Sequence, residues 1–154
     1  MRASDQYHAG IVVDDFDAAL SDLSALFGYE FASPLELSTP VRLPEGDETV
    51  ERTIQLRFTY SVSVPRVEVI QTIPGTLWTP AAGSGIHHLG YWSDDLAADS
   101  SLLEQRGYPM EAAGARDDGT AIWAYHRGAV GPRIELVSRE LLPFMEQWWS
   151  PSGS

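Results

Sequence analysis

The sequence predicts an α+β fold made of two tandem βαβββ modules, and the first observation behind this prediction is an internal repeat. Residues 8–18 read HAGIVVDDFDA and residues 88–98 read HLGYWSDDLAA, so His, Gly, Asp, Asp and Ala recur in the same order. The pair Gly28-Tyr29 returns as Gly107-Tyr108, and residues 67–70 (VEVI) resemble residues 134–137 (IELV). Because these matches keep their order at similar offsets, they indicate a duplication. The number of residues that separates matching positions falls along the chain, which indicates extra residues in the first copy, around residues 38–48.

The second observation is that the first copy contains one amphipathic helix between strand-like segments. Residues 7–13 are apolar and β-branched, which is typical of a strand. Asp15 or Asp17 can cap a helix whose apolar residues fall on one stripe, and Gly28 is suited to end it. Strand-like segments follow at residues 31–37, 50–60 and 64–72.

The second copy repeats this order of elements. Residues 86–93 predict a strand, Asp95 a helix cap and Gly107 a helix end, and residues 109–113, 120–127 and 132–138 predict three further strands. We therefore expect a single domain over residues 1–154, with module one at 5–73, a linker at 74–84 and module two at 85–139. A short apolar helix is expected at 140–149. We interpret it as closing the core or forming a dimer contact, in preference to a lid over the site.

Composition narrows the function. The chain has 154 residues, 44% of them hydrophobic, and a formal net charge of −12, so neither nucleic acid nor an anionic membrane is an expected partner. It contains no cysteine, and all ten basic residues are arginines, which excludes disulfides, thiolate catalysis and Schiff-base chemistry on lysine. No apolar run approaches the roughly 20 residues that a membrane helix needs, and no secretory signal is visible. We expect a cytoplasmic protein.

Four polar residues at repeat-related positions predict a metal site. His8 and His88 begin corresponding strands, and Glu68 and Glu135 each lie inside an apolar strand. A buried carboxylate is costly unless it is paired or binds a cation. Two imidazoles and two carboxylates suit one divalent ion, whether Zn, Ni, Co, Mn or Fe(II). His87 and His126 have no counterpart in the first copy, and we interpret both as core or surface residues.

The motifs at residues 8–15 (HAGIVVDD), 85–90 (GIHHLG) and 133–137 (RIELV) resemble the vicinal oxygen chelate superfamily. This superfamily includes glyoxalase I, methylmalonyl-CoA epimerase, extradiol dioxygenases and bleomycin-resistance proteins. The resemblance covers roughly residues 6–139. It implies the glyoxalase fold, in which two βαβββ modules form a curled, cup-shaped mixed sheet around the ion. It also implies His8, Glu68, His88 and Glu135 as ligands, a small-molecule substrate and a homodimer.

The complete ligand set resembles the glyoxalase I and methylmalonyl-CoA epimerase branch. This resemblance implies an isomerase, epimerase or lyase that acts on a small oxygenated carbonyl substrate through a metal-stabilised enediolate. Glu51 occupies the place of the epimerase base, and Glu135 or Glu68 could instead serve as base in the manner of glyoxalase I. One departure is the absence of lysine, since a coenzyme A thioester needs a basic rim for its phosphates.

Two alternatives remain open. An Fe(II) extradiol-type dioxygenase would use two histidines and one glutamate, which leaves the position of Glu68 free. A non-catalytic protein that binds an antibiotic or a hydrophobic metabolite would use aromatic surface such as Trp78, Trp92, Trp123 and Tyr125.

Overall fold

The computed structural model describes residues 1–83 and 85–150, so the last residue of the predicted linker, Ser84, lies outside the described residues. The first half contains β1 (Gln6–Val13), α1 (Phe16–Phe27), β2 (Leu35–Glu45), β3 (Glu48–Tyr60) and β4 (Arg66–Gln71). The second half contains β5 (Ile86–Ser93), α2 (Leu96–Gln105), β6 (Met110–Ala115), β7 (Ala121–His126), β8 (Arg133–Ser138) and α3 (Leu142–Trp148). Short 3₁₀ turns precede β1 (Ala3–Asp5) and α3 (Arg139–Leu141).

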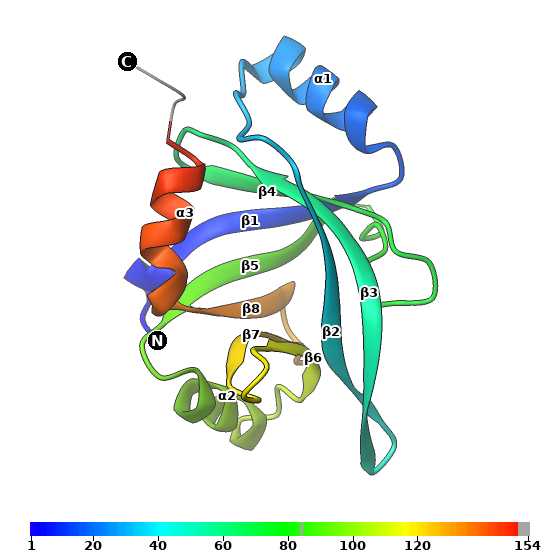
Figure 1. Cartoon of the computed structure of the whole chain (residues 1–154), viewed down its shortest axis with the longest axis vertical. Coiled ribbons are helices and arrows are strands. Elements are labelled where there is room, and N and C mark those ends of the chain that lie inside the picture. The colour runs from blue at the N-terminus through cyan, green and yellow to red at the C-terminus, as the bar shows by residue number, and fades with distance from the viewer. Residues whose placement is uncertain (84, 151–154) are drawn as a thin grey trace.

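The strands close into one barrel in the order β1-β4-β3-β2-β6-β7-β8-β5 (Figure 1). Each half follows the same plan, because β1 is parallel to β4 and β5 is parallel to β8. The two halves join where β1 and β5 run antiparallel. The predicted α+β fold of two βαβββ copies around a curled sheet is confirmed.

The helix boundaries follow the capping residues identified in the sequence. The Asp15 side chain accepts a hydrogen bond from the Ala18 amide, and Asp95 does the same for Ala98, both at 3.0 Å. Gly28 ends α1 in the left-handed conformation at φ 72°, which a residue without a Cβ adopts at little cost. Repeated capping therefore sets the two helices at matching places in each copy.

The insertion in the first copy is strand and not loop. The predicted strand at residues 31–37 overlaps β2 only at residues 35–37, because β2 begins at Leu35 and continues to Glu45, while Phe31 makes only an isolated bridge to Ser61. The inserted residues lengthen the β2–β3 hairpin, and within them Val41 pairs with Gly114 and Arg42 with Ala113 of β6. This contact closes the barrel between the two modules.

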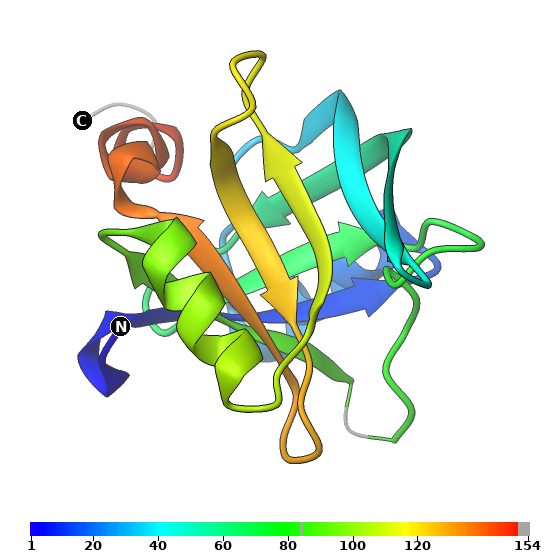
Figure 2. The same ribbon diagram turned by 90° about the horizontal axis from the view of Figure 1, so that it is seen from below.

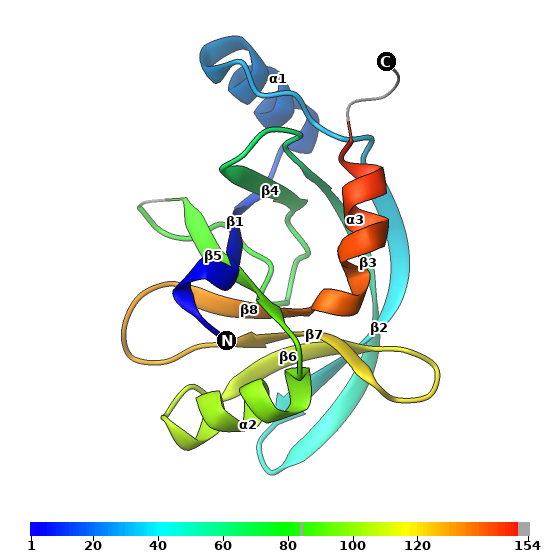
Figure 3. The same ribbon diagram turned by 90° about the vertical axis from the view of Figure 1, so that its left-hand side faces the viewer.

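The three helices cover the barrel unequally. The helix α2 lies against β7 and β8 (Figure 2). Leu96 and Leu103 of α2 are buried, whereas Phe16 is the one buried residue of α1. Leu26 and Phe27 near the end of α1 are 74% and 71% exposed. The helix α3 lies along one side of the barrel (Figures 1 and 3). Its residue Met145 is buried in the core. The structure contains one chain, so the homodimer predicted above stays a prediction. Among the described residues, no helix has the length and apolarity needed to cross a membrane.

Val41 is fully buried at the closure of the barrel, so its truncation tests the role of the insertion. We expect Val41→Ala to lower the free energy of unfolding by about 2 kcal/mol, because it removes two methyl groups and leaves a cavity. Val130→Ala is the matched control, since Val130 is 75% exposed and its truncation should change stability by less than about 0.5 kcal/mol. Equal effects in urea unfolding would contradict a structural role for the β2–β6 contact.

Candidate metal centre

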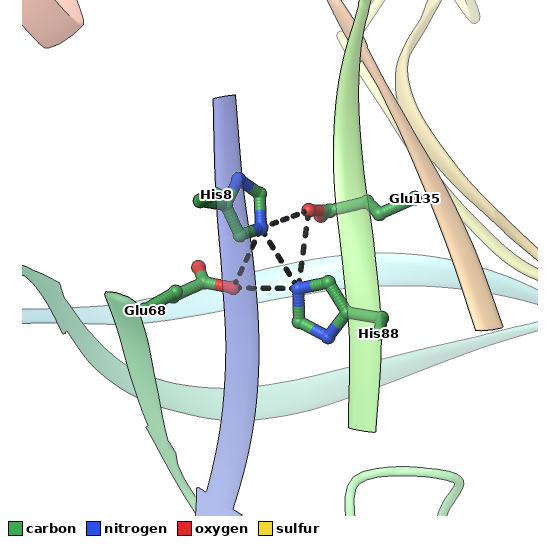
Figure 4. A group of neighbouring side chains, drawn as sticks. All are labelled: His8, Glu68, His88 and Glu135. Atoms are coloured by element: carbon green, nitrogen blue, oxygen red, sulfur yellow. Dashed lines mark hydrogen bonds and ion pairs between the residues drawn. The ribbon is translucent and has the colours of Figure 1, made fainter. Parts of the chain in front are cut away.

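The four predicted ligands meet inside the barrel, although they come from four different strands. His8 lies on β1, Glu68 on β4, His88 on β5 and Glu135 on β8, and one ligating atom of each lies within 4.8 Å of the others (Figure 4). The two Nε2 atoms are 2.9 Å apart. Each Nε2 lies between 2.9 and 3.5 Å from the Oε2 atoms of both glutamates. All four residues of the cluster are buried.

Strand pairing explains why the four side chains converge. Gly10 on β1 is flanked by Glu68 on one side and His88 on the other, and Gly90 on β5 is flanked by Glu135 and His8. Each histidine ring lies over the glycine of the other module. A Cβ atom at either glycine would lie 1.9 Å from the Cε1 atom of that ring, so a larger residue cannot fit there. The His-x-Gly repeat is thus a steric requirement of the crossed rings.

The geometry and the chemistry of the cluster fit a divalent ion. Donor atoms that each lie about 2.1 Å from a common ion are separated by about 3.0 to 3.4 Å when they are neighbours in its coordination shell. The observed separations of 2.9–3.5 Å span this range. The Oε2 atoms of Glu68 and Glu135 are buried, and apart from the two histidine nitrogens beside them they have no hydrogen-bond partner among the described residues. Buried carboxylate oxygens of this kind require a compensating cation.

The glutamates and histidines also shift one another's pKa values. Burial works against a charged imidazole, but the two adjacent carboxylates outweigh it and raise the pKa of His88 to about 9. The pKa of His8 is raised in the same way. Burial opposes charge on Glu68 and Glu135 as well, and the two histidines outweigh it, so both carboxyl pKa values lie below their usual range. Without an ion, the site holds protons in the place of a cation.

His87, which the sequence suggested to be a core or surface residue, is buried and holds His88 in place. Its Nε2 lies 2.8 Å from the Leu77 carbonyl oxygen, which can only accept, so Nε2 carries the hydrogen. Burial lowers the pKa of His87 to about 4, so the ring is neutral and its Nδ1 is an acceptor. The His88 Nδ1, 3.0 Å away, is then the donor. When His88 is neutral, this chain leaves the lone pair on its Nε2, which faces the cluster.

Tyr7 occupies the corresponding position in module one, where the surroundings are different. Its ring packs edge-on against His8 at 4.4 Å and stacks on Trp92 at 4.0 Å. The buried hydroxyl of Tyr7 and the Nδ1 of His8 both lack a hydrogen-bond partner in the described part of the chain. The support that His88 receives from His87 therefore has no counterpart at His8.

A cavity of about 310 Å³ opens beside the cluster, and Glu68 and Glu135 belong to its lining. Tyr60 and Tyr125 line it next to these glutamates, since Tyr60 is paired with Glu68 and Tyr125 with Glu135 across neighbouring strands. The helix α3, which we had expected only to close the core or a dimer contact, contributes both to the core and to the cavity wall. The carboxylates thus link the cluster to a space where a small molecule can bind.

Glu51 does not belong to this site. It shares β3 with the cavity residues Leu56 and Phe58 but has the opposite strand parity, so its side chain faces outward and is exposed. Its cross-strand neighbour is Arg42 on β2. The prediction of Glu51 as the base is corrected here, because the extended hairpin turns that side of β3 toward solvent.

A barrel of two βαβββ copies with a buried His/Glu cluster defines a class of small duplicated proteins that could hold one metal ion. The sequence profile of the Glyoxalase/Bleomycin resistance protein/Dioxygenase superfamily matches residues 7–125, and the chain belongs to this superfamily. No curated protein matches the sequence.

Solved structures with the same fold include two methylmalonyl-CoA epimerases. One, in complex with methylmalonyl-CoA, is 16% identical with a TM-score of 0.58, and the match covers 86% of this chain and 92% of that chain. The epimerase from Mycobacterium tuberculosis is 20% identical with a TM-score of 0.55, over 90% and 92% of the two chains. A mutant of 4-hydroxymandelate synthase from Streptomyces coelicolor is 12% identical with a TM-score of 0.52, over 86% of this chain and 48% of that chain. At these identities the likeness shows the fold alone.

The hydrogen-bond chain through His87 predicts an effect on metal binding. We expect His87→Leu to weaken zinc or cobalt affinity by about 10- to 100-fold, because His88 loses the acceptor that orients its ring. His87→Gln should recover part of this loss, since an amide can accept from His88 and donate to Leu77. Titration against a competing chelator measures both affinities. Wild-type affinity in His87→Leu would contradict the positioning role.

The raised histidine pKa values predict how stability depends on pH in chelator-treated protein. A pKa raised in the folded state stabilises it fully below the unfolded value near 6.5, and this contribution is lost as pH rises through about 9. The lowered glutamate pKa values contribute a constant amount across this window. The free energy of unfolding should therefore fall between pH 6.5 and 9.5, as urea titrations can measure.

Two comparisons complete this experiment. His88→Gln should show a smaller fall, because it lacks one of the two shifted groups. Zinc-loaded protein should lose less stability than chelator-treated protein over the same interval, because the ion replaces the protons. A metal-free stability that is constant or rises with pH would show that the imidazoles are not protonated in the cluster.

Proposed function

We propose that this chain is a divalent-metal-dependent isomerase, epimerase or lyase that moves a proton next to a carbonyl group of a small molecule. The observation that carries this proposal is that Glu68 and Glu135 belong both to the buried cluster and to the lining of the cavity. A molecule in the cavity would thus lie directly against the residues that hold the ion.

The residues of the cluster fit Zn, Ni, Co, Mn or Fe(II), held by His8, Glu68, His88 and Glu135. A divalent ion in this position supplies Lewis-acid stabilisation of negative charge that develops on an oxygen of the substrate. A six-coordinate ion held by these four residues would keep two further positions, which would suit a substrate that offers two adjacent oxygens.

The proton acceptor in this proposal is one of the two cavity glutamates. Both carboxyl groups are ionised, because the two histidines hold their pKa values below the usual range in the metal-free site. In the loaded site the histidines would be neutral ligands, so the charge that makes these carboxylates weak bases would be absent. Tyr7 is suited to a second role, because the residue lines the cavity and its buried hydroxyl has no hydrogen-bond partner in the described part of the chain. Burial and then the charges of Glu135 and Glu68 raise the pKa of Tyr7, so its hydroxyl keeps its hydrogen and can donate it to a substrate oxygen.

The ligand set argues against the dioxygenase alternative. That reaction would use two histidines and one glutamate, yet the Oε2 atoms of Glu68 and Glu135 approach the histidine nitrogens equally closely, at 2.9 and 3.1 Å for the nearest pairs. A fourth ligand at the same distance favours an ion with two open positions for a chelating substrate.

The test is proton exchange in heavy water. Chelator-treated protein is reloaded with each of the five ions and mixed with a panel of α-hydroxyketones, and NMR follows deuterium entering the carbon next to the carbonyl. Exchange should require the ion and vanish in His88→Ala. The base variant, either Glu68→Gln or Glu135→Gln, should lose exchange by about 10²- to 10⁴-fold while the protein still binds metal.

Glu51→Gln is the matched control, because it makes the same chemical change on the outer face of β3. It should exchange at the wild-type rate. Oxygen consumption with catechols and no exchange would support the dioxygenase instead. Ligand binding that is unaffected by chelator, together with protein that takes up none of the ions, would indicate a non-catalytic binding protein.

A further inference from the structure

We propose that the substrate is a compact, uncharged molecule with a largely apolar body, such as an aromatic ring, attached directly to the two oxygens that reach the ion. This inference rests on the proposed function and narrows it to one class of substrate. It follows from the side chains that line the cavity and from the cavity volume. It also follows from the absence of a positively charged side chain among the described residues of the cavity wall.

The wall of the cavity is aromatic and aliphatic. Apart from the two glutamates, its polar atoms belong to the tyrosines, the indole nitrogens of the tryptophans and Thr39. Six aromatic side chains surround the space: Tyr7, Phe58, Tyr60, Trp123 and Tyr125 from the strands, and Trp78 from the segment between β4 and β5. Aromatic walls of this kind bind flat apolar groups through large contact areas and edge-to-face packing.

The charge balance of the site favours a neutral ligand. Two carboxylates and one divalent cation sum to zero when both histidines are neutral, so the loaded site has no excess positive charge for an anion. No arginine is among the residues that line the cavity in the described chain. Arg57, Arg133 and Arg139 instead pair with acidic side chains that do not line it.

A coenzyme A thioester or a dicarboxylate does not match this wall. Each carries charge beyond the pair of oxygens that would reach the ion, and burying an unpaired anionic group against apolar side chains is costly. The methylmalonyl-CoA bound by a protein of the same fold therefore belongs to a class of ligand that this cavity disfavours.

The volume sets the size of the molecule. A cavity of about 310 Å³ equals the volume of about ten water molecules, so it accommodates on the order of ten to fifteen non-hydrogen atoms. This is enough for a phenyl group with a short oxygenated chain and too little for a nucleotide-bearing thioester.

The helix α3 extends the apolar wall toward solvent. Trp148 packs edge-on against Phe58 at 5.5 Å and against Tyr60 at 5.6 Å, and its Nε1 donates to the Ser33 carbonyl at 2.9 Å. Phe144 lines the cavity and is also 55% exposed, which places it at the rim. A ligand that enters past Phe144 thus meets apolar surface from the rim to the carboxylates.

The experiment uses cobalt-loaded protein and 1-phenylpropane-1,2-dione, a neutral vicinal diketone that carries a phenyl group. Tryptophan fluorescence reports occupation of the cavity, and the visible absorption of cobalt reports oxygens at the ion. We expect binding about 10- to 100-fold tighter than that of butane-2,3-dione, which lacks the ring. Oxaloacetate and methylmalonyl-CoA should bind at least about tenfold more weakly than the phenyl diketone.

Phe144→Ala should weaken binding of the phenyl diketone by about 5- to 10-fold, because part of the apolar wall is lost, and it should leave cobalt affinity unchanged. Phe27→Ala is the matched control, since Phe27 is exposed on α1 and does not line the cavity. Equal binding in Phe144→Ala and in wild-type protein would contradict the route along α3.

The outcomes separate this inference from the proposed function. If the protein binds cobalt and the charged ligands bind as tightly as the phenyl diketone or more tightly, the substrate class is overturned and the metal-dependent function stands. If the phenyl diketone binds without altering the cobalt spectrum, the inference fails because the oxygens do not reach the ion. If the protein takes up no cobalt, the proposed function itself fails.

Discussion

Two carboxylates and two imidazoles face one another inside a barrel, and the cost of burying them together constrains the rest of the structure. Each side chain of the cluster is at most 8% exposed, so water cannot compensate its charge. The compensation comes from protons on the histidines or from a cation between the four groups. The parallel pairs β1–β4 and β5–β8, the antiparallel pair β1–β5 and the two glycines all serve to bring these four atoms within a few ångströms.

The repeat made this part of the fold predictable from sequence. Corresponding histidines and glutamates in two similar strands are rare by chance, and one cation between them would use all four. The glycines of the His-x-Gly motifs were visible as part of the repeat, but their role was not. It depends on β1 lying antiparallel to β5 at one register, in which each glycine faces the ring of the opposite histidine.

The strand whose bounds were predicted incorrectly, β2, depends on contacts with residues that are far away in the sequence. The inserted residues of module one contain two prolines, which donate no ladder hydrogen bond and weaken a strand pattern. They form β2 because Val41 and Arg42 find partners on β6, far away in the sequence. Glu51 is a second case in which the local sequence did not predict the position of a residue in the fold. Its place in the resemblance to the epimerase suggested a base, but the face that a strand residue presents depends on its parity in the folded hairpin.

The two modules are symmetric at the cluster and asymmetric around it, and this difference assigns them different tasks. At one pair of corresponding positions, His87 in module two forms the hydrogen-bond chain that orients His88, whereas Tyr7 in module one lines the cavity and its buried hydroxyl has no partner among the described residues. His87 does not line the cavity, and Tyr7 makes no hydrogen bond to His8. A duplicated barrel can change such positions one copy at a time, because the four ligands keep their geometry through the strand register alone. His87 therefore acts on the geometry of the cluster from module two, whereas Tyr7, the long β2–β3 hairpin and α3 shape the cavity.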